Sequence, residues 1–326
     1  MTDDSIEAGD AAFRAGGLRE RWPEMTYGGA LSFLRRRYAR DLAGVDVAVM
    51  GVPWDSAVTY RPGCRLGPRA IRAASVQLAE LKAFPWGFSP LEALAVVDWG
   101  DVMLDPHHPA TVAPAIEAAA AGIIAAGAKL IAFGGDHFVT WPLLAAHAAR
   151  HGALALVHVD AHGDLWPDDP GRIDHGTMMG RAIREGLVDA ARSTQIGIRT
   201  FHDSDEGLEI LTAPWVHRNG VAAAVEVVRA RAGDAPVYLS FDIDALDPAF
   251  APGTGTPVPG GLASWQALEL VRGLGGLNLV GMDVVEVSPP FDHAEITALA
   301  AATLAHDWLC LLAQARGAAP QPVGRL

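Results

Sequence analysis

Two short acidic runs hold the residues of this chain whose types and spacing could do chemistry. Asp160, His162 and Asp164 alternate in the first run, and Asp242 and Asp244 alternate in the second. Each run follows an apolar, strand-like segment, and every second side chain of an extended chain points to the same side. Carboxylates packed this closely resist ionisation unless a strong positive charge lies among them. The spacing therefore predicts that both runs bind metal.

A sixth candidate ligand, His137, closes the sequence Gly-Gly-Asp-His after another apolar segment. Four Asp and two His form an oxygen-rich set that suits Mn²⁺ best, with Ni²⁺, Co²⁺ or Fe²⁺ as alternatives. Such a set exceeds the needs of one catalytic zinc, and it suffices for two cations that share carboxylates and activate a bridging water. One Asp after a strand is usually a helix cap and one His is usually a core residue, but the matched set favours metal-assisted hydrolysis.

Runs rich in Val, Ile and Leu predict the strands that must position these ligands, at 45–51, 94–97, 129–133, 153–159, 194–198, 237–241 and 277–285. Helical patterns lie between most of them, at 67–81, 111–126, 140–151, 175–186, 221–232, 264–274 and 295–313. The alternation predicts a single α/β domain of three layers, in which helices cover both faces of an open, mostly parallel sheet. Because ligands bind beyond the carboxyl ends of parallel strands, the candidate ligands and Glu286 should meet at one edge.

Composition limits the kinds of partner that the protein can have. The chain has 326 residues, of which 50% are hydrophobic, and a formal net charge of −13. This charge argues against a nucleic-acid or anionic-membrane surface and fits a small cationic substrate. The two cysteines, Cys64 and Cys310, have no metal-ligand spacing and are expected to be buried small residues.

The beginning of the chain differs from the rest. Residues 1–43 are polar, charged and proline-containing, which predicts an N-terminal arm ahead of a catalytic domain at 44–326. The first residues lack the basic start and apolar core of a secretory signal, so we expect the protein in the cytoplasm.

Four motifs resemble the signatures of the ureohydrolases, the family of arginases and agmatinases. They are Gly134-Gly135-Asp136-His137, the run 160–164, the segment 240–248 (Ser-Phe-Asp-Ile-Asp-Ala-Leu-Asp-Pro) and the segment 281–287 (Gly-Met-Asp-Val-Val-Glu-Val). The loops 61–69 and 251–257 also agree, so the resemblance extends over residues 51–312. Within the family the chain is most similar to the bacterial agmatinases, through 84–86, 133–140, 174–178 and 195–200. The resemblance implies an arginase-like fold and hydrolysis of a guanidino group to urea and a primary amine, such as agmatine to putrescine.

The resemblance also implies a role for each candidate ligand. One metal would be held by His137 and Asp164, the other by His162 and Asp244, and Asp160 and Asp242 would bridge both. The family is also known for homo-oligomers, which implies a trimer or a hexamer here. Two other interpretations are a non-catalytic regulatory paralogue and a one-zinc deacetylase of the same architecture. The intact set of six ligands argues against both.

Three residues would act directly in the reaction that the resemblance implies. Glu286 would bind the guanidinium through paired acceptor oxygens. Asp164 would take a proton from the attacking water and pass it to the leaving nitrogen, and His175 would shuttle protons at the pocket mouth. The structural alternatives are that Glu286 pairs with a nearby arginine and that Asp174 or His175 only caps the following helix.

Other polar residues near the motifs have less certain roles. Asp136 could orient His137 or a substrate, or cap the helix that begins near Val139. Arg61 and Arg65 could shape the rim of the pocket or form salt bridges.

The loop after Asp164 bears on the substrate. It reads Leu-Trp-Pro-Asp-Asp-Pro over 165–170 and lacks the Asn and Ser set typical of arginine-handling members, so arginine is not the expected substrate. Asp168 and Asp169 could attract the ammonium group of agmatine, although an exposed acidic loop is usually only solvated. Arg172 could instead pair with the carboxylate of 4-guanidinobutyrate, and Trp166 could narrow the pocket for a shorter guanidine.

Overall fold

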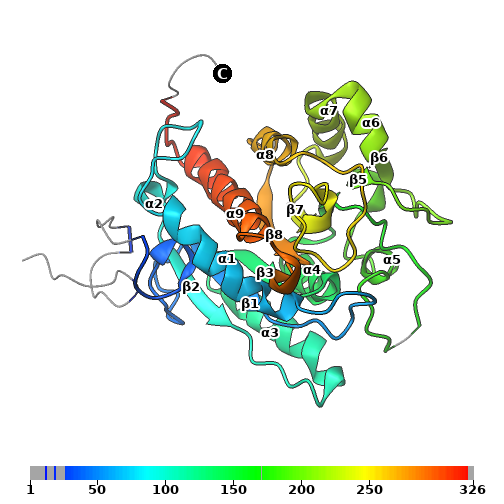
Figure 1. Cartoon of the computed structure of the whole chain (residues 1–326), viewed down its shortest axis with the longest axis horizontal. Coiled ribbons are helices and arrows are strands. Elements are labelled where there is room, and N and C mark those ends of the chain that lie inside the picture. The colour runs from blue at the N-terminus through cyan, green and yellow to red at the C-terminus, as the bar shows by residue number, and fades with distance from the viewer. Residues whose placement is uncertain (1–11, 13–17, 20–25, 170, 322–326) are drawn as a thin grey trace, which may run out of the picture.

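The computed structural model describes residues 12, 18–19, 26–169 and 171–321. Eight strands form a single sheet in the order β2-β1-β3-β8-β7-β4-β5-β6, and each neighbouring pair runs parallel (Figure 1). Their carboxyl ends therefore lie along the same edge of the sheet. The prediction of an open parallel α/β sheet is confirmed.

Seven of the eight strands coincide with predicted ones. The strands are β1 (Val47–Val52), β2 (Val96–Asp101), β3 (Lys129–Gly134), β4 (Ala155–Val159), β5 (Thr194–Ile198), β6 (Glu209–Thr212), β7 (Val237–Asp242) and β8 (Leu279–Val285). The strand that was not predicted, β6, lies at the edge of the sheet and pairs only with β5. Its four residues, Glu-Ile-Leu-Thr, are too few and too weakly buried to give a clear strand pattern.

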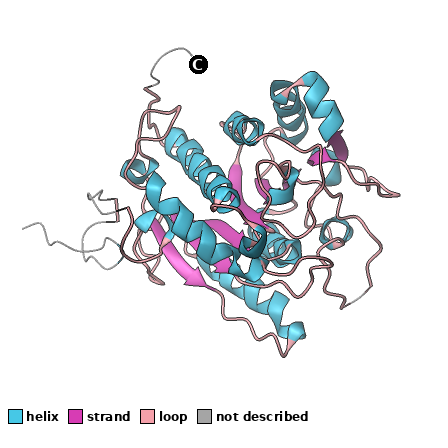
Figure 2. Ribbon diagram, viewed as in Figure 1, coloured by secondary structure: helices cyan, strands magenta, loops and turns pink. Residues whose placement is uncertain are grey.

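Helices cover both faces of the sheet, as Figure 2 shows. One layer contains α1 (Gly67–Ser75), α6 (Ala213–Asn219), α7 (Val221–Ala232), α8 (Ser264–Gly273) and α9 (Ile296–Ala315), with the single turn α2 (Pro90–Ala93) beside α9. The other layer contains α3 (Val112–Ala125), α4 (Thr140–His151) and α5 (Met178–Arg184). Each layer encloses its own hydrophobic core.

The central strands are buried on both faces, which is why they read as continuous apolar runs. In β1, Val47 and Val49 pack into the core beneath α1 and α9, whereas Ala48 and Met50 pack into the core beneath α3 and α4. This alternation follows from the two-residue repeat of an extended chain. The sheet is thus fixed firmly enough to hold loops at its edge in a defined geometry.

The apolar helix α9 belongs to the interior of the fold. It is long and apolar enough to cross a membrane by composition alone, but 78% of its most apolar window is buried inside the protein. Figure 1 shows it running beside α1, and it also packs against α8. Burial in the core accounts for its composition.

About half of the predicted N-terminal arm lies outside the described residues. The described part enters the body of the fold: Phe33 and Leu34 are fully buried, and the ring of Phe33 lies edge-on to Phe133 with centroids 4.9 Å apart. The backbone N–H of Phe33 also donates a hydrogen bond to Asp98, at 2.8 Å. The boundary at residue 43 stays a prediction.

Candidate metal centre

The six predicted ligands follow three strands near the middle of the sheet. His137 comes shortly after β3, the run 160–164 follows β4, and Asp242 ends β7. Glu286 follows β8, which lies between β3 and β7. Four consecutive strands in space, β3-β8-β7-β4, therefore deliver these groups to one edge, as their order and parallel direction require.

A close approach of backbones places His137. The N–H groups of Gly135 and Asp136 donate to the carbonyl oxygens of Val52 and Trp54, both at 2.8 Å. A Cβ on Gly135 would lie 1.5 Å from the Trp54 carbonyl oxygen, so only glycine permits this contact. The turn carries His137 over the carboxyl ends of the strands.

The imidazole of His137 faces three carboxylates. Its Nδ1 lies 3.0 Å from Asp160 Oδ2, 3.1 Å from Asp164 Oδ2 and 3.2 Å from Asp242 Oδ2. This nitrogen is buried and has no hydrogen-bond partner among the described residues. Ligand atoms about 3 Å apart are what an octahedral cation with bonds of about 2.1 Å brings together.

The contacts of the opposite ring nitrogen explain the protonation state of His137. Nε2 lies 2.9 Å from Ser240 Oγ, whose own proton is donated to Asp283 at 2.8 Å. Ser240 therefore accepts the Nε2 proton, and Nδ1 keeps its lone pair. A neutral imidazole held in this tautomer by a second partner is the usual form of a metal-binding histidine.

His162 and Asp244 form the second half of the cluster. His162 Nδ1 lies 3.0 Å from Asp244 Oδ2 and 3.4 Å from Asp160 Oδ1. Asp160 thus contacts both histidines. Asp244 also accepts hydrogen bonds from the Ala161 N–H (3.1 Å) and the Thr256 hydroxyl (3.3 Å).

His158 is a site residue that the sequence prediction missed. Its Nε2 donates to Asp160 Oδ2 at 2.8 Å, and its Nδ1 accepts from Gln195 Nε2 at 3.0 Å. It extends the alternation of 160, 162 and 164 one step back into β4, which was the available signal. His158 orients the carboxylate that both histidines share.

The charges of the cluster fit a bound cation. Burial raises the pKa of Asp242 well above its usual value, and the nearby Asp244 and Asp160 raise it further. Burial lowers the pKa of His162, but the Asp244 and Asp160 carboxylates outweigh it and raise this pKa to about 12. Buried carboxylates that repel each other and draw protons onto nearby groups are stabilised by divalent cations. The residues present therefore fit a metal centre.

Glu286 and His175 lie together beside this cluster. Glu286 Oε1 accepts the His137 backbone N–H and contacts His175 Nδ1, both at 2.9 Å, while the buried Oε2 has no hydrogen-bond partner. No arginine pairs with Glu286 within the described chain, contrary to the structural alternative. Burial lowers the pKa of His175, but Glu286 outweighs it and raises this pKa to about 9.

The predicted helix at 175–186 begins later than expected. The structure starts α5 at Met178, so His175 lies in the preceding loop, and no side chain caps the helix. The Asp174 carboxylate instead accepts the Gly176 N–H at 2.8 Å in a local turn. His175 is therefore free to face Glu286 and the hydroxyl of Thr59, 3.0 Å from its Nε2.

Two site residues adopt left-handed backbone conformations. The φ angle is 51° at Asp164 and 63° at Glu286. Such angles cost a residue with a side chain about 1 kcal/mol or more, and they persist where the surrounding structure enforces them. In both residues the unusual angle coincides with a carboxylate directed into the cluster.

A small cavity of about 30 Å³ opens beside the ligands, lined by Thr59, His137, His162, Asp164, Trp166, His175, Gly176, Asp242 and Thr256. Trp166 is 43% exposed and forms the outer part of this wall. Its indole lies against Gly176, where a Cβ would come within 2.1 Å of the ring. The indole therefore narrows the entrance, and no lysine or arginine is among these lining residues.

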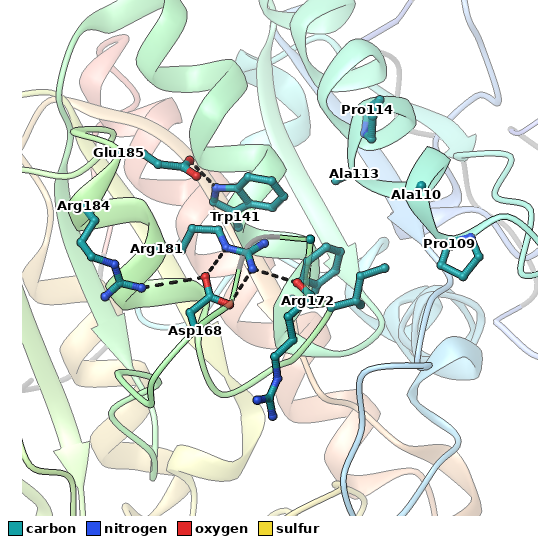
Figure 3. Close-up of a pocket in the computed structure, with 13 residues that line it drawn as sticks. Pro109, Ala110, Ala113, Pro114, Trp141, Asp168, Arg172, Arg181, Arg184 and Glu185 are labelled. Carbon is teal, nitrogen blue, oxygen red and sulfur yellow. Dashed lines mark hydrogen bonds and ion pairs between the residues drawn. The ribbon is translucent and has the colours of Figure 1, made fainter.

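Asp168 and Arg172, which follow Trp166, line a different pocket, of about 650 Å³ (Figure 3). Arg181 binds both oxygens of Asp168 at 2.6 Å, which makes this carboxylate unavailable to a substrate ammonium. Arg172 pairs with Asp174 and extends away from Asp168. Neither Asp168 nor Arg172 lines the small cavity.

The remaining candidates have structural contacts. The Asp136 carboxylate does not cap a helix but accepts the Ala57 N–H at 2.8 Å. Arg65 pairs with Asp55, and Arg61 lies over the rings of Tyr60 and Phe291, about 5 Å from each centroid. These contacts hold the loop 55–65 next to the site.

Comparison with known proteins identifies the family. Residues 45–310 match the model of the arginase family. An agmatinase of Chromobacterium violaceum is 59% identical over 314 residues, which cover 96% of this chain and 97% of that protein. An agmatinase of Escherichia coli O7:K1 is 52% identical over 273 residues, which cover 83% of this chain and 89% of that protein.

Solved structures agree in fold. The crystal structure of a hypothetical agmatinase from Burkholderia thailandensis matches with a TM-score of 0.93 and 55% identity, over 94% of this chain and 98% of that one. Proclavaminate amidino hydrolase from Streptomyces clavuligerus matches with a TM-score of 0.83 and 39% identity, over 90% of this chain and 100% of that one. The resemblance drawn from the motifs is confirmed, and the chain belongs to the arginase family.

Proposed function

We propose that this protein is a binuclear-metal ureohydrolase that converts agmatine to putrescine and urea. The observation that carries the proposal is the contact network that links all six predicted ligands, with Glu286 beside it. Relatives named agmatinase at 52–59% identity support the choice of substrate.

In this proposal His137 and Asp164 would hold one metal, His162 and Asp244 would hold the other, and Asp160 and Asp242 would contribute to both. The oxygen-rich donors favour Mn²⁺ over softer cations, with Ni²⁺ or Co²⁺ as alternatives. A pair of divalent cations, when bound, activates water for attack at neutral pH. Ser240 and His158 support this role, since each fixes the orientation of one ligand.

Glu286 binds the guanidinium group of the substrate. Its Oε2 atom is buried without a hydrogen-bond partner, and a planar guanidinium presents two parallel N–H groups to a carboxylate. Leaving such an oxygen unpaired costs free energy, and a bound cation removes that cost. The carboxylate therefore selects a cation and fixes the plane of the group to be attacked.

Asp164 and His175 move the protons. Asp164 lines the cavity with one oxygen near His137, so it can accept the proton that water loses on attack and pass it to the leaving nitrogen. His175 lines the same cavity and contacts the Thr59 hydroxyl, which extends a path for protons outward. The products are urea and a free amine.

The lining of the cavity favours an amine tail over a carboxylate tail. No lysine or arginine lines it among the described residues, and Arg172 lines the separate larger pocket. A carboxylate tail, as in 4-guanidinobutyrate, would lie near Asp164 and Asp242 without a lysine or arginine to pair with. Agmatine, with a cation at each end, avoids this repulsion.

Urea release by Mn²⁺-loaded protein tests the proposal, with agmatine, 4-guanidinobutyrate, 3-guanidinopropionate and arginine compared side by side. We expect preference for agmatine, and loss of activity with every compound in Asp242→Ala. Preference for 4-guanidinobutyrate would reassign the substrate within the family. Two bound metals without urea from any compound would overturn the enzymatic proposal and favour a regulatory paralogue.

We also propose that the protein acts as a homo-oligomer in the cytoplasm. Cys64 and Cys310 are buried and unpaired, as suits a reducing compartment. Large apolar side chains such as Phe201 and Trp265 are 84% and 62% exposed, which suits a surface that meets another subunit. Light scattering during size-exclusion chromatography should give three or six times the mass of one chain, and a monomer would contradict this part.

A further inference from the structure

We propose that Arg199 is a positioning residue that ties together the two segments bearing His162 and Asp244, and so governs one half of the metal centre. The inference rests on the proposed two-metal function. It concerns a residue that touches neither the ligand side-chain atoms nor the small cavity.

The backbone of Arg199 holds the first segment. Arg199 follows β5, the neighbour of β4, and its N–H donates to the Ala161 carbonyl at 2.9 Å. Ala161 lies between Asp160 and His162. The hydroxyl of Thr200 donates to the same carbonyl at 3.1 Å. The loop with His162 is thereby anchored to the end of β5.

The guanidinium of Arg199 holds the second segment. It donates to the carbonyl oxygens of Asp244 (2.6 Å), Ala245 (3.2 Å) and Leu246 (3.3 Å). Three successive carbonyls in the turn after β7 thus point at one cation. The planar, five-donor guanidinium can satisfy them together, which a lysine ammonium on its flexible stem cannot do with the same geometry.

The same guanidinium also fixes the loop that covers Asp244. Its Nε and Nη2 donate to the Val258 carbonyl at 3.0 and 2.8 Å. Two residues before Val258, the Thr256 hydroxyl donates to Asp244 Oδ2. Arg199 therefore controls both the backbone of this ligand and one partner of its carboxylate.

The hydrogen bonds of Arg199 are unusual for an arginine surrounded by acids. All of its side-chain bonds go to backbone carbonyls, and no carboxylate lies within ion-pair distance among the residues described. Its charge nevertheless acts on Asp244, Asp160 and Asp242. The positive charge thus offsets carboxylate repulsion while leaving the carboxylate oxygens available to metal.

The two ligands that the proposal assigns to the other metal alone, His137 and Asp164, are held by residues other than Arg199. His137 is held by Ser240 and Glu286. The Asp164 carbonyl accepts N–H groups from the start of α5, at 3.2 and 3.3 Å. Loss of the Arg199 guanidinium should therefore weaken the binding of one metal and leave the binding of the other unchanged.

The test is Mn²⁺ binding by isothermal titration calorimetry and electron paramagnetic resonance for Arg199→Lys and Arg199→Gln. Arg229→Gln is the matched control, because Arg229 also binds only carbonyls, of Gly273 and Gly275, on the exposed side of α7. We expect two metals in the wild type and the control. In both Arg199 variants, one metal should bind about 10- to 100-fold more weakly, and the spin-coupled spectrum of a metal pair should give way to that of an isolated ion.

Activity supplies a second readout. Excess Mn²⁺ should restore turnover in Arg199→Lys, because the ligands themselves remain. Equal weakening of the binding of both metals, or unchanged binding, would overturn the inference.

A second variant covers the case in which the Arg199 variants do not fold by circular dichroism. Thr200→Val, which removes only the hydroxyl contact with Ala161, must still weaken the binding of one metal selectively. A wild type that binds fewer than two metals would instead contradict the proposed function.

Discussion

At the scale of single residues, the most informative group is the Glu286 carboxylate. One of its oxygens holds His137 and His175 in place, while the other is buried and unpaired. The residue also has a left-handed φ of 63°. A side chain that is both strained and incompletely bonded in a well-packed protein is a candidate for ligand binding.

Replacing Glu286 by Gln should separate substrate binding from metal binding. The amide keeps the shape but loses the charge and one acceptor, so we expect kcat/KM for agmatine to fall about 100-fold, or about 3 kcal/mol. Metal content by plasma mass spectrometry should stay at the wild-type level. Glu269→Gln, on the exposed surface of α8, should change neither quantity. Unchanged kcat/KM in Glu286→Gln would rule out the proposed role.

Trp166 should act on the tail of the substrate rather than on the reaction. Its indole forms the outer wall of the cavity and packs against Gly176. We expect Trp166→Ala to raise KM for agmatine about tenfold through loss of aromatic contact, with a smaller change in kcat. Trp166→Phe should keep most of the affinity. Steady-state kinetics of both variants test this expectation. An equal fall of kcat in Trp166→Ala and Trp166→Phe would contradict the proposal that Trp166 acts as a wall of the cavity.

At the scale of elements, contacts with α5 hold the loop that follows Asp164 in place. Trp166 and His175 face the small cavity, whereas Asp168 faces α5 and is held there by Arg181. Arg181 also lies over the Trp141 ring, with 4.6 Å to its centroid (Figure 3). The side chains of this ion pair are 10% and 8% exposed, so the pair is nearly buried.

Breaking this ion pair should loosen the loop. Arg181→Met leaves a buried carboxylate without its main partner, so we expect the free energy of unfolding to fall by about 3 kcal/mol and KM for agmatine to rise. Asp168→Asn in the Arg181→Met background should restore part of the stability. Arg192→Met, which breaks a surface pair with Asp234, is the control and should have little effect. Urea unfolding measures the free energy of unfolding, and steady-state kinetics measure KM. If the effects of Arg181→Met and Asp168→Asn on the free energy of unfolding simply add, the two side chains are not coupled.

The elements also show what could be predicted from sequence. Strands such as β3 and β7 were predictable because burial on both faces makes them continuous apolar runs. The edge strand β6 lacks that signal, since pairing with β5 defines it. The short helix α6 has a local start signal, the Thr212 side chain that accepts the Trp215 N–H, but it is too short for a clear helical period. The start of α5 was wrong because helical periodicity gives no sign that Asp174 closes a local turn.

The same contrast holds for the candidate site. Period-2 spacing at strand ends predicted five of the six proposed ligands, because ligand chemistry and strand geometry are both local properties. The direction of Asp168 and Arg172 was not predictable, since it depends on Arg181 and on the path of a loop. Arg199 stood in a motif, but its role depends on carbonyls brought together from three segments.

At the scale of the whole molecule, each of the two cores contains a buried histidine. His147 lies on α4 and donates to the Leu143 carbonyl at 2.8 Å, and His306 lies on α9. Burial lowers the pKa of each to about 4. Since both remain neutral when folded, acid must favour the unfolded chain.

The pH dependence of stability should report on these histidines. A folded pKa near 4 against an unfolded value of 6.5 means that the stability contributed by the neutral histidine is complete above pH 6.5, is lost progressively as the pH falls from about 6.5 to about 4, and falls no further below that. We expect His306 to contribute a loss of about 2 kcal/mol between pH 7.5 and pH 5.0. Urea unfolding measures this change. Between the two pH values, the free energy of unfolding of His306→Gln should fall by about 2 kcal/mol less than that of the wild type. The exposed His217→Gln should match the wild type, and an unchanged slope in His306→Gln would contradict the argument.

The position of β8 in the sheet bears on how the protein is made. This strand, formed by residues near the end of the chain, is the only link between β3 on one side and β7 on the other within the described sheet. His137 belongs to the first half, and the other five ligands belong to the second. In a chain still emerging from the ribosome, β3 and β7 cannot be joined through the sheet until β8 has been made. The proposed metal centre is therefore among the last features to assemble, and a truncated translation product ending before β8 carries all six proposed ligands without the strand that brings them together.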